Sequence, residues 1–250
     1  MTNKWLPVNF GILVKGFIIF FCTLSVVSCA PPMAQTTTSS TPRFTTYTAA
    51  YQISLAKVER PKTASKRYGA QKVDSIATDQ KYKFAFEDDM VRILWYVGNT
   101  QISFLLQNKT DYSIKIPWDE AAYVDEFGRS HRVMHSGVKY TDRDSPMPPS
   151  VVVRKGSIED IVYPTDYVSW SSGSRYTAGR WDEKPLFLCV DFHGLYLPGK
   201  YSTFDEFEKA VNANVGKQIQ VLLPLQIQDV INDYIFTFNI DKATASTQSQ

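Results

Sequence analysis

The segment Val91-Arg92-Ile93-Leu94-Trp95-Tyr96-Val97 is closed by Gly98-Asn99, and the chain resumes with Ile102, Phe104 and Leu106 set between polar residues. Alternation of apolar and polar residues with a period of two is typical of a strand with one buried face. Glycine and asparagine between two such runs favour a tight turn. This part of the chain therefore predicts paired β-strands.

Runs of the same kind recur on both sides of this segment, and the gaps between them are rich in Gly, Pro, Asn and Asp. They cover residues 51–58, 83–86, 114–116, 123–124, 131–133, 150–153, 158–163, 219–223 and 234–240. About ten short strands without a βαβ rhythm indicate an all-β fold, and we expect a two-sheet sandwich.

One segment breaks the period of two. Thr203-Phe204-Asp205-Glu206 has the form of a capping box, with Thr203 as the N-cap and Glu206 three residues later. Apolar residues then follow at helical spacing as far as Val211, and Gly216 lies past the expected end. The pattern predicts one short helix at residues 203–214, packed against an edge or end of the sheets.

The order of the runs resembles the immunoglobulin-like domains of bacterial lipoproteins over residues 48–240. The similar features are Phe104-Leu105-Leu106-Gln107-Asn108, the piece Gly156–Pro164 and a final strand at Tyr234–Phe238. The resemblance implies an immunoglobulin-like sandwich, and such domains mostly bind or scaffold. A fold by itself assigns no function.

The first 28 residues have the composition of a secretory signal peptide. Lys4 and Lys15 precede the apolar run Phe17–Leu24, which is too short to span a bilayer. Val26-Val27-Ser28-Cys29 resembles the lipobox of bacterial lipoproteins, which implies cleavage before Cys29, acyl chains such as palmitate on its thiol, and a membrane anchor. By the same resemblance, Ala30 implies the outer membrane. The alternatives are an ordinary secretion signal cut near Ser28 or Ala30, and a retained membrane helix that would bury Lys15.

The rest of the chain divides by composition. Residues 29–46 combine the lipidated cysteine with a Ser/Thr/Pro-rich tether that we expect to be disordered, because it has little apolar surface to bury. Residues 47–242 carry the β pattern and form the predicted sandwich domain. The tail 243–250 is polar, and we expect it to be disordered as well.

Charge and cysteine content argue against some classes of function and against a disulfide-bonded domain. The chain has 27 Lys+Arg and 25 Asp+Glu without a basic run, which argues against nucleic-acid binding. Cys189 is the only cysteine after Cys29, so no intramolecular disulfide is expected in the domain. It lies in the apolar run Leu186–Val190 and is predicted to be a buried hydrophobic residue rather than a nucleophile.

No motif points to catalysis or to a cofactor. His131 and His135 would stand about 13 Å apart along a strand, too far to share a metal ion, and Arg132 replaces the glutamate of the metalloprotease pattern. Acidic pairs such as Asp88-Asp89 lie at predicted turns and are expected to be solvated. We therefore expect no metal site and no cofactor. The absence of motifs favours a protein that is not an enzyme, but it leaves the question open because glycosidases need no short motif.

Residues 165–185 are the candidate contact segment. The stretch is too polar and too rich in Gly and Ser for a predicted strand, yet it contains residue types that are enriched at binding hot spots. The candidate partner-binding residues are Tyr167, Trp170, Arg175, Tyr176, Arg180 and Trp181. In the alternative interpretation, Trp170 and Trp181 fold inward as a lid over one end of the sandwich.

The sequence thus predicts a lipid-anchored binding or assembly module of the cell envelope, with an envelope protein or a glycan as its partner. The alternative is a cell-wall or glycan-directed enzyme or binder that uses the same segment with Asp166 or Asp182. A deep cleft converging on those carboxylates would favour the enzyme, and a flat aromatic patch would favour the module.

Overall fold

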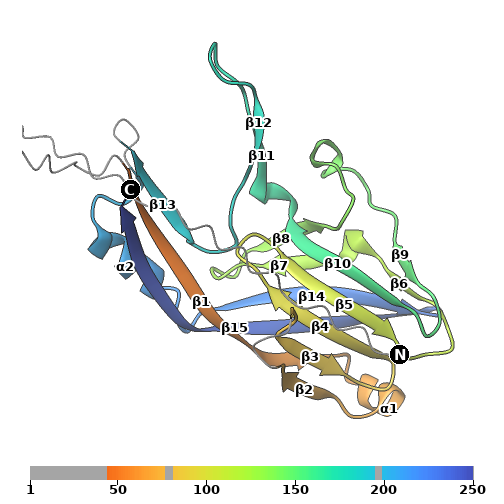
Figure 1. Ribbon diagram of the computed structural model, residues 1–250. Helices are drawn as coiled ribbons and strands as arrows, with labels where there is room; N and C mark the ends of the chain where they lie inside the picture. The colour runs from red at the N-terminus through yellow and green to blue at the C-terminus, as the bar shows by residue number, and fades with distance from the viewer. Residues whose placement is uncertain (1–43, 77–80, 195–198, 250) are drawn as a thin grey trace, which may run out of the picture. The chain divides into compact units, whose positions relative to one another are not determined.

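The computed structural model describes residues 44–76, 81–194 and 199–249 (Figure 1). The predicted signal peptide, Cys29 and most of the tether lie outside the described residues. Among the residues described, no helix is long and apolar enough to cross a membrane.

The described chain is mostly β, as predicted. The strands are β1 (Phe44–Glu59), β2 (Lys72–Ser75), β3 (Phe84–Glu87), β4 (Val91–Val97), β5 (Ile102–Asn108), β6 (Ile114–Ile116), β7 (Ala122–Val124), β8 (Ser130–Met134), β9 (Ser150–Val152), β10 (Ser157–Pro164), β11 (Val168–Ser171), β12 (Arg180–Glu183), β13 (Val190–Gly194), β14 (Gln218–Ile227) and β15 (Val230–Ser249). The helices are α1 (Ala64–Tyr68) and α2 (Phe204–Asn212), with 3₁₀ turns at Trp118–Glu120, Tyr140–Asp142 and Thr165–Tyr167.

Within the described residues, thirteen strands form one antiparallel sheet, and β11 pairs with β12 in a second, small one. The order in the large sheet is β13-β1-β15-β14-β7-β8-β10-β5-β4-β3-β2, with β6 beside β14 and β9 beside β6. The sheet curls, so that β3 and β4 face β15 across the core (Figure 1).

Aromatic rings fill the space inside the curl. Trp95 on β4 lies 4.7 Å from Phe236 on β15 and 5.2 Å from Phe104 on β5, measured between ring centroids. All three side chains are fully buried. The register pairs Trp95 with Phe104 and Ile93 with Leu106, as a period of two on both strands requires. The predicted pairing of this segment is confirmed.

The predicted helix is confirmed as α2. The Thr203 hydroxyl accepts a hydrogen bond from the Glu206 N–H at 3.2 Å, and a Glu206 carboxylate oxygen accepts one from the Ser202 N–H at 2.9 Å. The helix buries Phe207 and Val211 against β15 and β1. Gly216, at φ +84°, ends the turn that follows the helix.

The expectation of a disordered tail is wrong for residues 243–249, which continue β15. Residues Thr45–Gln52 of β1 pair with Lys242–Ser249 in continuous antiparallel register. The tail carries little apolar surface, but its threonines suit a strand and its backbone groups have a partner in β1. The last residues of the predicted tether, from Phe44 onward, are also part of β1.

Cys189 is buried, as predicted, at 8% exposure. Burial raises the pKa of its thiol to about 11, with a smaller opposing effect from a backbone hydrogen bond. A thiol that stays protonated at neutral pH is a poor nucleophile.

Candidate functional site

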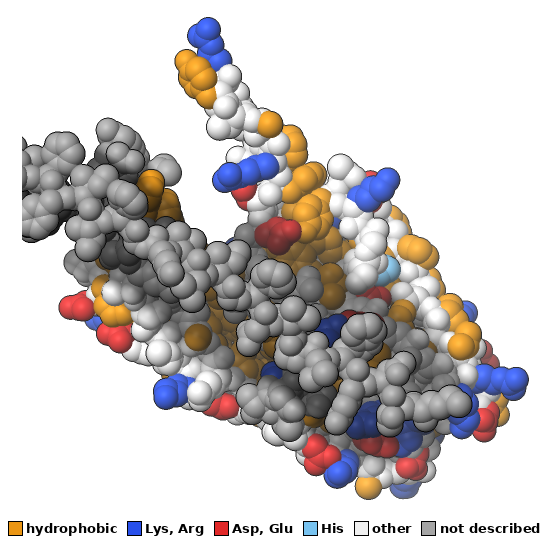
Figure 2. Space-filling view, viewed as in Figure 1, with side chains coloured by type: hydrophobic (Ala, Val, Ile, Leu, Met, Phe, Trp, Pro, Cys, Tyr) orange, Lys and Arg blue, Asp and Glu red, His pale blue; other side chains and the backbone are white. Residues whose placement is uncertain are grey.

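The candidate segment 165–185 forms a hairpin arm, which we define as β11, the tip 172–179 and β12. The arm projects away from the large sheet in Figures 1 and 2. Its strands pair from Val168 opposite Glu183 to Ser171 opposite Arg180, and Trp170 lies opposite Trp181. The expectation that this segment is too polar to form strands is wrong.

Two close approaches explain why glycines are required in the arm. A Cβ on Gly179 would lie 2.4 Å from Cζ2 of Trp170, and a Cβ on Gly173 would lie 2.3 Å from the carbonyl oxygen of Thr177. At the tip, Ser174 and Thr177 are joined by a hydrogen bond from the Ser174 N–H at 2.9 Å. The Gly and Ser content that argued against a strand therefore belongs to a tight hairpin end.

The tryptophan pair stiffens the arm near its base. The rings of Trp170 and Trp181 meet edge to face, with centroids 5.4 Å apart. Trp181 also meets the ring of Tyr140 at 5.6 Å, and the Arg143 guanidinium lies 5.3 Å from the centroid of the Trp181 indole. Trp181 is accordingly half-buried, whereas Trp170 is 54% exposed. Trp181 and Tyr140 pack against the hydrophobic core, whereas Trp170 is not among the residues that contact it.

Tyr140 and Arg143 fix the base of the arm from a separate segment. The Tyr140 hydroxyl donates a hydrogen bond to the Glu183 carboxylate, which, with burial as the second cause, raises the pKa of Tyr140 to about 12. Arg143 donates to the Tyr140 carbonyl oxygen at 2.8 Å. Sequence reasoning missed both residues, because they lie about 40 positions before their partners in β12 and no local pattern links them.

The remaining candidate residues lie at the tip, in β12 or in the core. Tyr176 is 87% exposed, and the Arg175 guanidinium lies 6.0 Å from its ring centroid. Arg180 is exposed and donates to Asp182 at 2.8 Å. Tyr167 is buried at 4% exposure below the arm, so it is not accessible as a contact residue. Figure 2 shows basic and hydrophobic side chains together at the tip of the arm.

The histidines have separate partners. His131 lies between two carboxylates, with Nδ1 2.8 Å from Asp166 and Nε2 3.2 Å from Asp125. His135 stacks on Trp118, with centroids 4.6 Å apart, and lies 3.6 Å from the Asp160 carboxylate. No group of three or more potential metal ligands was found among the residues that the structure describes.

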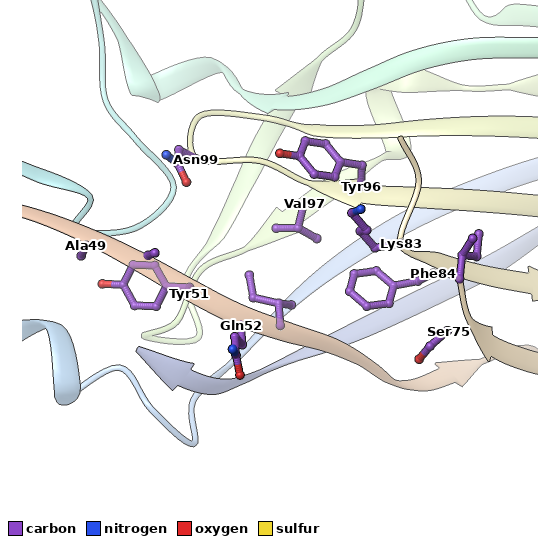
Figure 3. A pocket seen from close by; sticks show the side chains of 12 residues that line it. Ala49, Tyr51, Gln52, Ser75, Lys83, Phe84, Tyr96, Val97 and Asn99 are labelled. Atoms are coloured by element: carbon purple, nitrogen blue, oxygen red, sulfur yellow. The ribbon is translucent and has the colours of Figure 1, made fainter. Parts of the chain in front are cut away.

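A cleft of about 600 Å³ opens between β1 and the β3–β4 pair. Figure 3 shows Tyr51, Tyr96 and Phe84 around it, together with Lys83 and Asn99. Neither Asp166 nor Asp182 lines this cleft. Asp166 lies 2.8 Å from His131 and Asp182 lies 2.8 Å from Arg180, so the two carboxylates have separate partners.

Comparison with protein-family models, with curated proteins and with solved structures finds no match to this chain.

Proposed function

We propose that the chain is an exported, lipid-anchored protein that acts as a non-enzymatic binding or assembly module in the cell envelope, with the arm as its contact element. The domain is proposed to be a variant of the immunoglobulin-like domains that it resembles in sequence pattern. The observation that carries the proposal is the arm with its exposed tip.

An isolated two-stranded hairpin is only marginally stable in water. This arm is supported at its base by Tyr140 and Arg143, while its tip presents Tyr176 and Arg175 to solvent. An exposed tyrosine and arginine on a preformed hairpin offer a partner rigid, amphipathic contact area at low entropic cost. The arm therefore has the composition and the geometry of a contact element.

The role of the arm is tested by measuring how tightly the purified protein binds to cell envelopes that are isolated from a strain lacking this protein. We expect Tyr176→Ala and Trp170→Ala to weaken binding by about 30-fold, which corresponds to about 2 kcal/mol for a hot-spot aromatic. Val151→Ala is the matched control, because Val151 is an exposed apolar residue on β9, outside the arm. Equal affinities for all four proteins would overturn the arm's role.

The membrane anchor rests on the lipobox-like tetrad that ends at Cys29. Two or three acyl chains contribute about 0.8 kcal/mol per buried methylene, enough to hold the protein at a membrane, and Ala30 favours the outer membrane as the destination. Metabolic labelling with a fatty-acid analogue should mark the wild-type protein and not Cys29→Ser. Equal labelling of the two proteins would disprove the anchor.

The alternative partner is a glycan of the cell wall. The exposed faces of Trp170 and Tyr176 favour it, since aromatic faces suit sugar rings. Binding to purified cell-wall glycan that is free of protein, lost in Tyr176→Ala and retained in Val151→Ala, would select this alternative. Release of soluble glycan fragments by the wild-type protein would point to an enzyme.

A further inference from the structure

A second cleft, of about 490 Å³, lies between the β7–β8 turn, residues 184–188 and the end of α2. It contains no residue of β11, the tip or β12, but Tyr167, Lys184 and Pro185 of the candidate segment 165–185 line it. Its walls carry four basic side chains, Arg129, Lys184, Lys200 and Lys217. Among the described residues, none of these four forms an ion pair with a carboxylate.

Aromatic rings hold these cations in place. The Lys184 ammonium lies 4.0 Å from the ring centroid of Tyr167, and the Lys217 ammonium lies 4.3 Å from that of Phe127. The Arg129 guanidinium lies 5.7 Å from the same Phe127 ring. Cation–π contacts orient a charge without neutralising it, so the positive charge of the cleft stays available to a ligand.

The two carboxylates of the cleft do not cancel this charge. Asp125 accepts hydrogen bonds from the N–H groups of Phe127 and Arg129 at 2.9 and 2.8 Å and lies 3.2 Å from His131. Burial acts to raise its pKa, but these hydrogen bonds outweigh burial and the pKa is lowered. Glu126 is partly buried, and this burial raises its pKa. Four cations thus face two carboxylates, and the charges of Lys184 and Lys217 act to lower the pKa of Glu126 against the effect of burial.

The rest of the cleft wall is mostly apolar. It includes Pro185, Leu186, Phe187 and Leu188 and, at the end of the helix, Ala210 and Ala213, with Tyr201 and Asn214 as polar members. Leu186 and Phe187 are almost completely buried, at 2% and 3% exposure, so the apolar surface that a ligand can cover belongs mainly to Pro185, Leu188 and the helix end.

We infer that this cleft binds a small amphiphilic anion, whose phosphate or carboxylate pairs with Lys184 and Lys217 and whose apolar part lies against Pro185–Leu188. An ion pair formed in a partly buried cleft is stronger than one in bulk water, because the effective dielectric constant is lower. The anion can belong to a free metabolite or to a lipid headgroup, which share this chemistry.

The inference is tested by titrating the purified protein with hexyl phosphate and with inorganic phosphate, followed by calorimetry. We expect hexyl phosphate to bind more tightly, because only it covers the apolar wall. Lys184→Gln and Lys217→Gln should each weaken hexyl phosphate binding at least tenfold, and Glu126→Gln should strengthen it by removing a negative charge. Lys115→Gln is the control, because Lys115 is an exposed lysine of β6 outside the cleft.

Vesicles containing phosphatidylglycerol distinguish the two sources. Displacement of hexyl phosphate by these vesicles would identify the ligand as a lipid headgroup, and a lack of displacement would identify it as a free anion. Failure of hexyl phosphate to bind, or equal weakening in Lys115→Gln and Lys217→Gln, would overturn the site. Lys184 is exposed, so Lys184→Gln remains informative if Lys217→Gln does not fold.

Discussion

At the scale of single residues, Asp88 departs furthest from its sequence-based interpretation. The expected solvated turn is wrong for this residue, whose side chain is fully buried. Its Oδ2 accepts a hydrogen bond from the Arg60 guanidinium at 2.8 Å and another from the Tyr234 hydroxyl at 3.1 Å, and its Oδ1 accepts from the Met90 and Val91 N–H groups. Arg60 also donates to the Gly69 carbonyl oxygen, so this network joins β1, β3–β4 and β15.

Asp88→Ala should therefore destabilise the fold by about 3–5 kcal/mol, because it leaves the Arg60 charge buried without its partner. Asp89→Ala is the matched control, since Asp89 is exposed and should cost no more than about 0.5 kcal/mol. Urea denaturation measures both changes. Equal midpoints for the two variants would mean that the buried ion pair contributes no stability.

Asp160 links stability to pH. Burial acts to raise its pKa, but the His135 imidazole 3.6 Å away and hydrogen bonds from the N–H groups of Ser136 and Ile161 outweigh burial, so that the pKa is lowered. A carboxyl group with a pKa lower in the folded state than in the unfolded chain stabilises the fold above the unfolded value of about 3.9. This stability is lost as the pH falls through the folded pKa.

We therefore expect the free energy of unfolding to fall below about pH 4, and to fall less steeply in Asp160→Asn. Denaturation series at pH 3 and pH 6 measure the difference. Asp166→Asn is the control, because the Asp166 carboxylate is exposed. An identical pH dependence in wild type and Asp160→Asn would show that Asp160 does not contribute to the loss of stability at low pH.

At the scale of elements, the arm shows how a polar segment becomes a hairpin. Its Ser and Gly content predicts a loop rather than strands, but a projecting pair of strands needs no apolar face along its whole length. The tryptophan pair and the contacts of Trp181 with Tyr140 and Arg143 supply local packing instead. The arm therefore depends on a few ring contacts, and these are unequal for its two tryptophans.

Trp181→Ala should cost about 2 kcal/mol of stability, less than the 3–5 kcal/mol of a fully buried aromatic, because Trp181 is half-buried. Trp170→Ala should cost about 1 kcal/mol, since it loses mainly the edge-to-face pair. Tyr176→Ala should leave the melting temperature unchanged. Thermal melts of the three variants test this order, and large losses in both tryptophan variants would instead indicate that both rings close the core.

At the scale of the whole described fold, the long ribbon of β1 and β15 joins the two ends of the domain sequence. Phe44 to Glu59 run beside Ile235 to Ser249, and β13 extends the sheet on the other side of β1. The helix α2 covers part of this ribbon through Phe207, whose ring centroid lies 5.6 Å from that of Tyr47. The final residues of the chain are therefore structural.

Deleting residues 241–250 should expose to hydrogen exchange those amides of residues 45–51 that donate to β15, because their partners are removed. The Ala49 amide donates to the Cys189 carbonyl oxygen instead and keeps its partner. The amides of β4 and β5 should remain protected, since their ladder lies elsewhere in the sheet. Deleting only residues 248–250 is the control and should leave the amides of residues 49–51 unchanged. Unchanged protection of residues 45–51 in the longer deletion would contradict the role of the tail.

The local elements followed from the sequence alone. The period of two identified most strands, the capping box at Thr203 identified α2, and the apolar run around Cys189 predicted its burial. These signals work because alternation and capping are properties of neighbouring residues, and each reports whether one face of a segment is buried.

Only the tertiary structure decided which distant segments of the chain contact one another. Tyr234 and Asp88 are 146 residues apart, and the end of β15 becomes a strand because β1 lies beside it. The four basic residues of the second cleft come from separate segments. Strand pairing, buried charge pairs and clefts depend on which distant segments meet, and a local pattern carries no information about the identity of a distant partner.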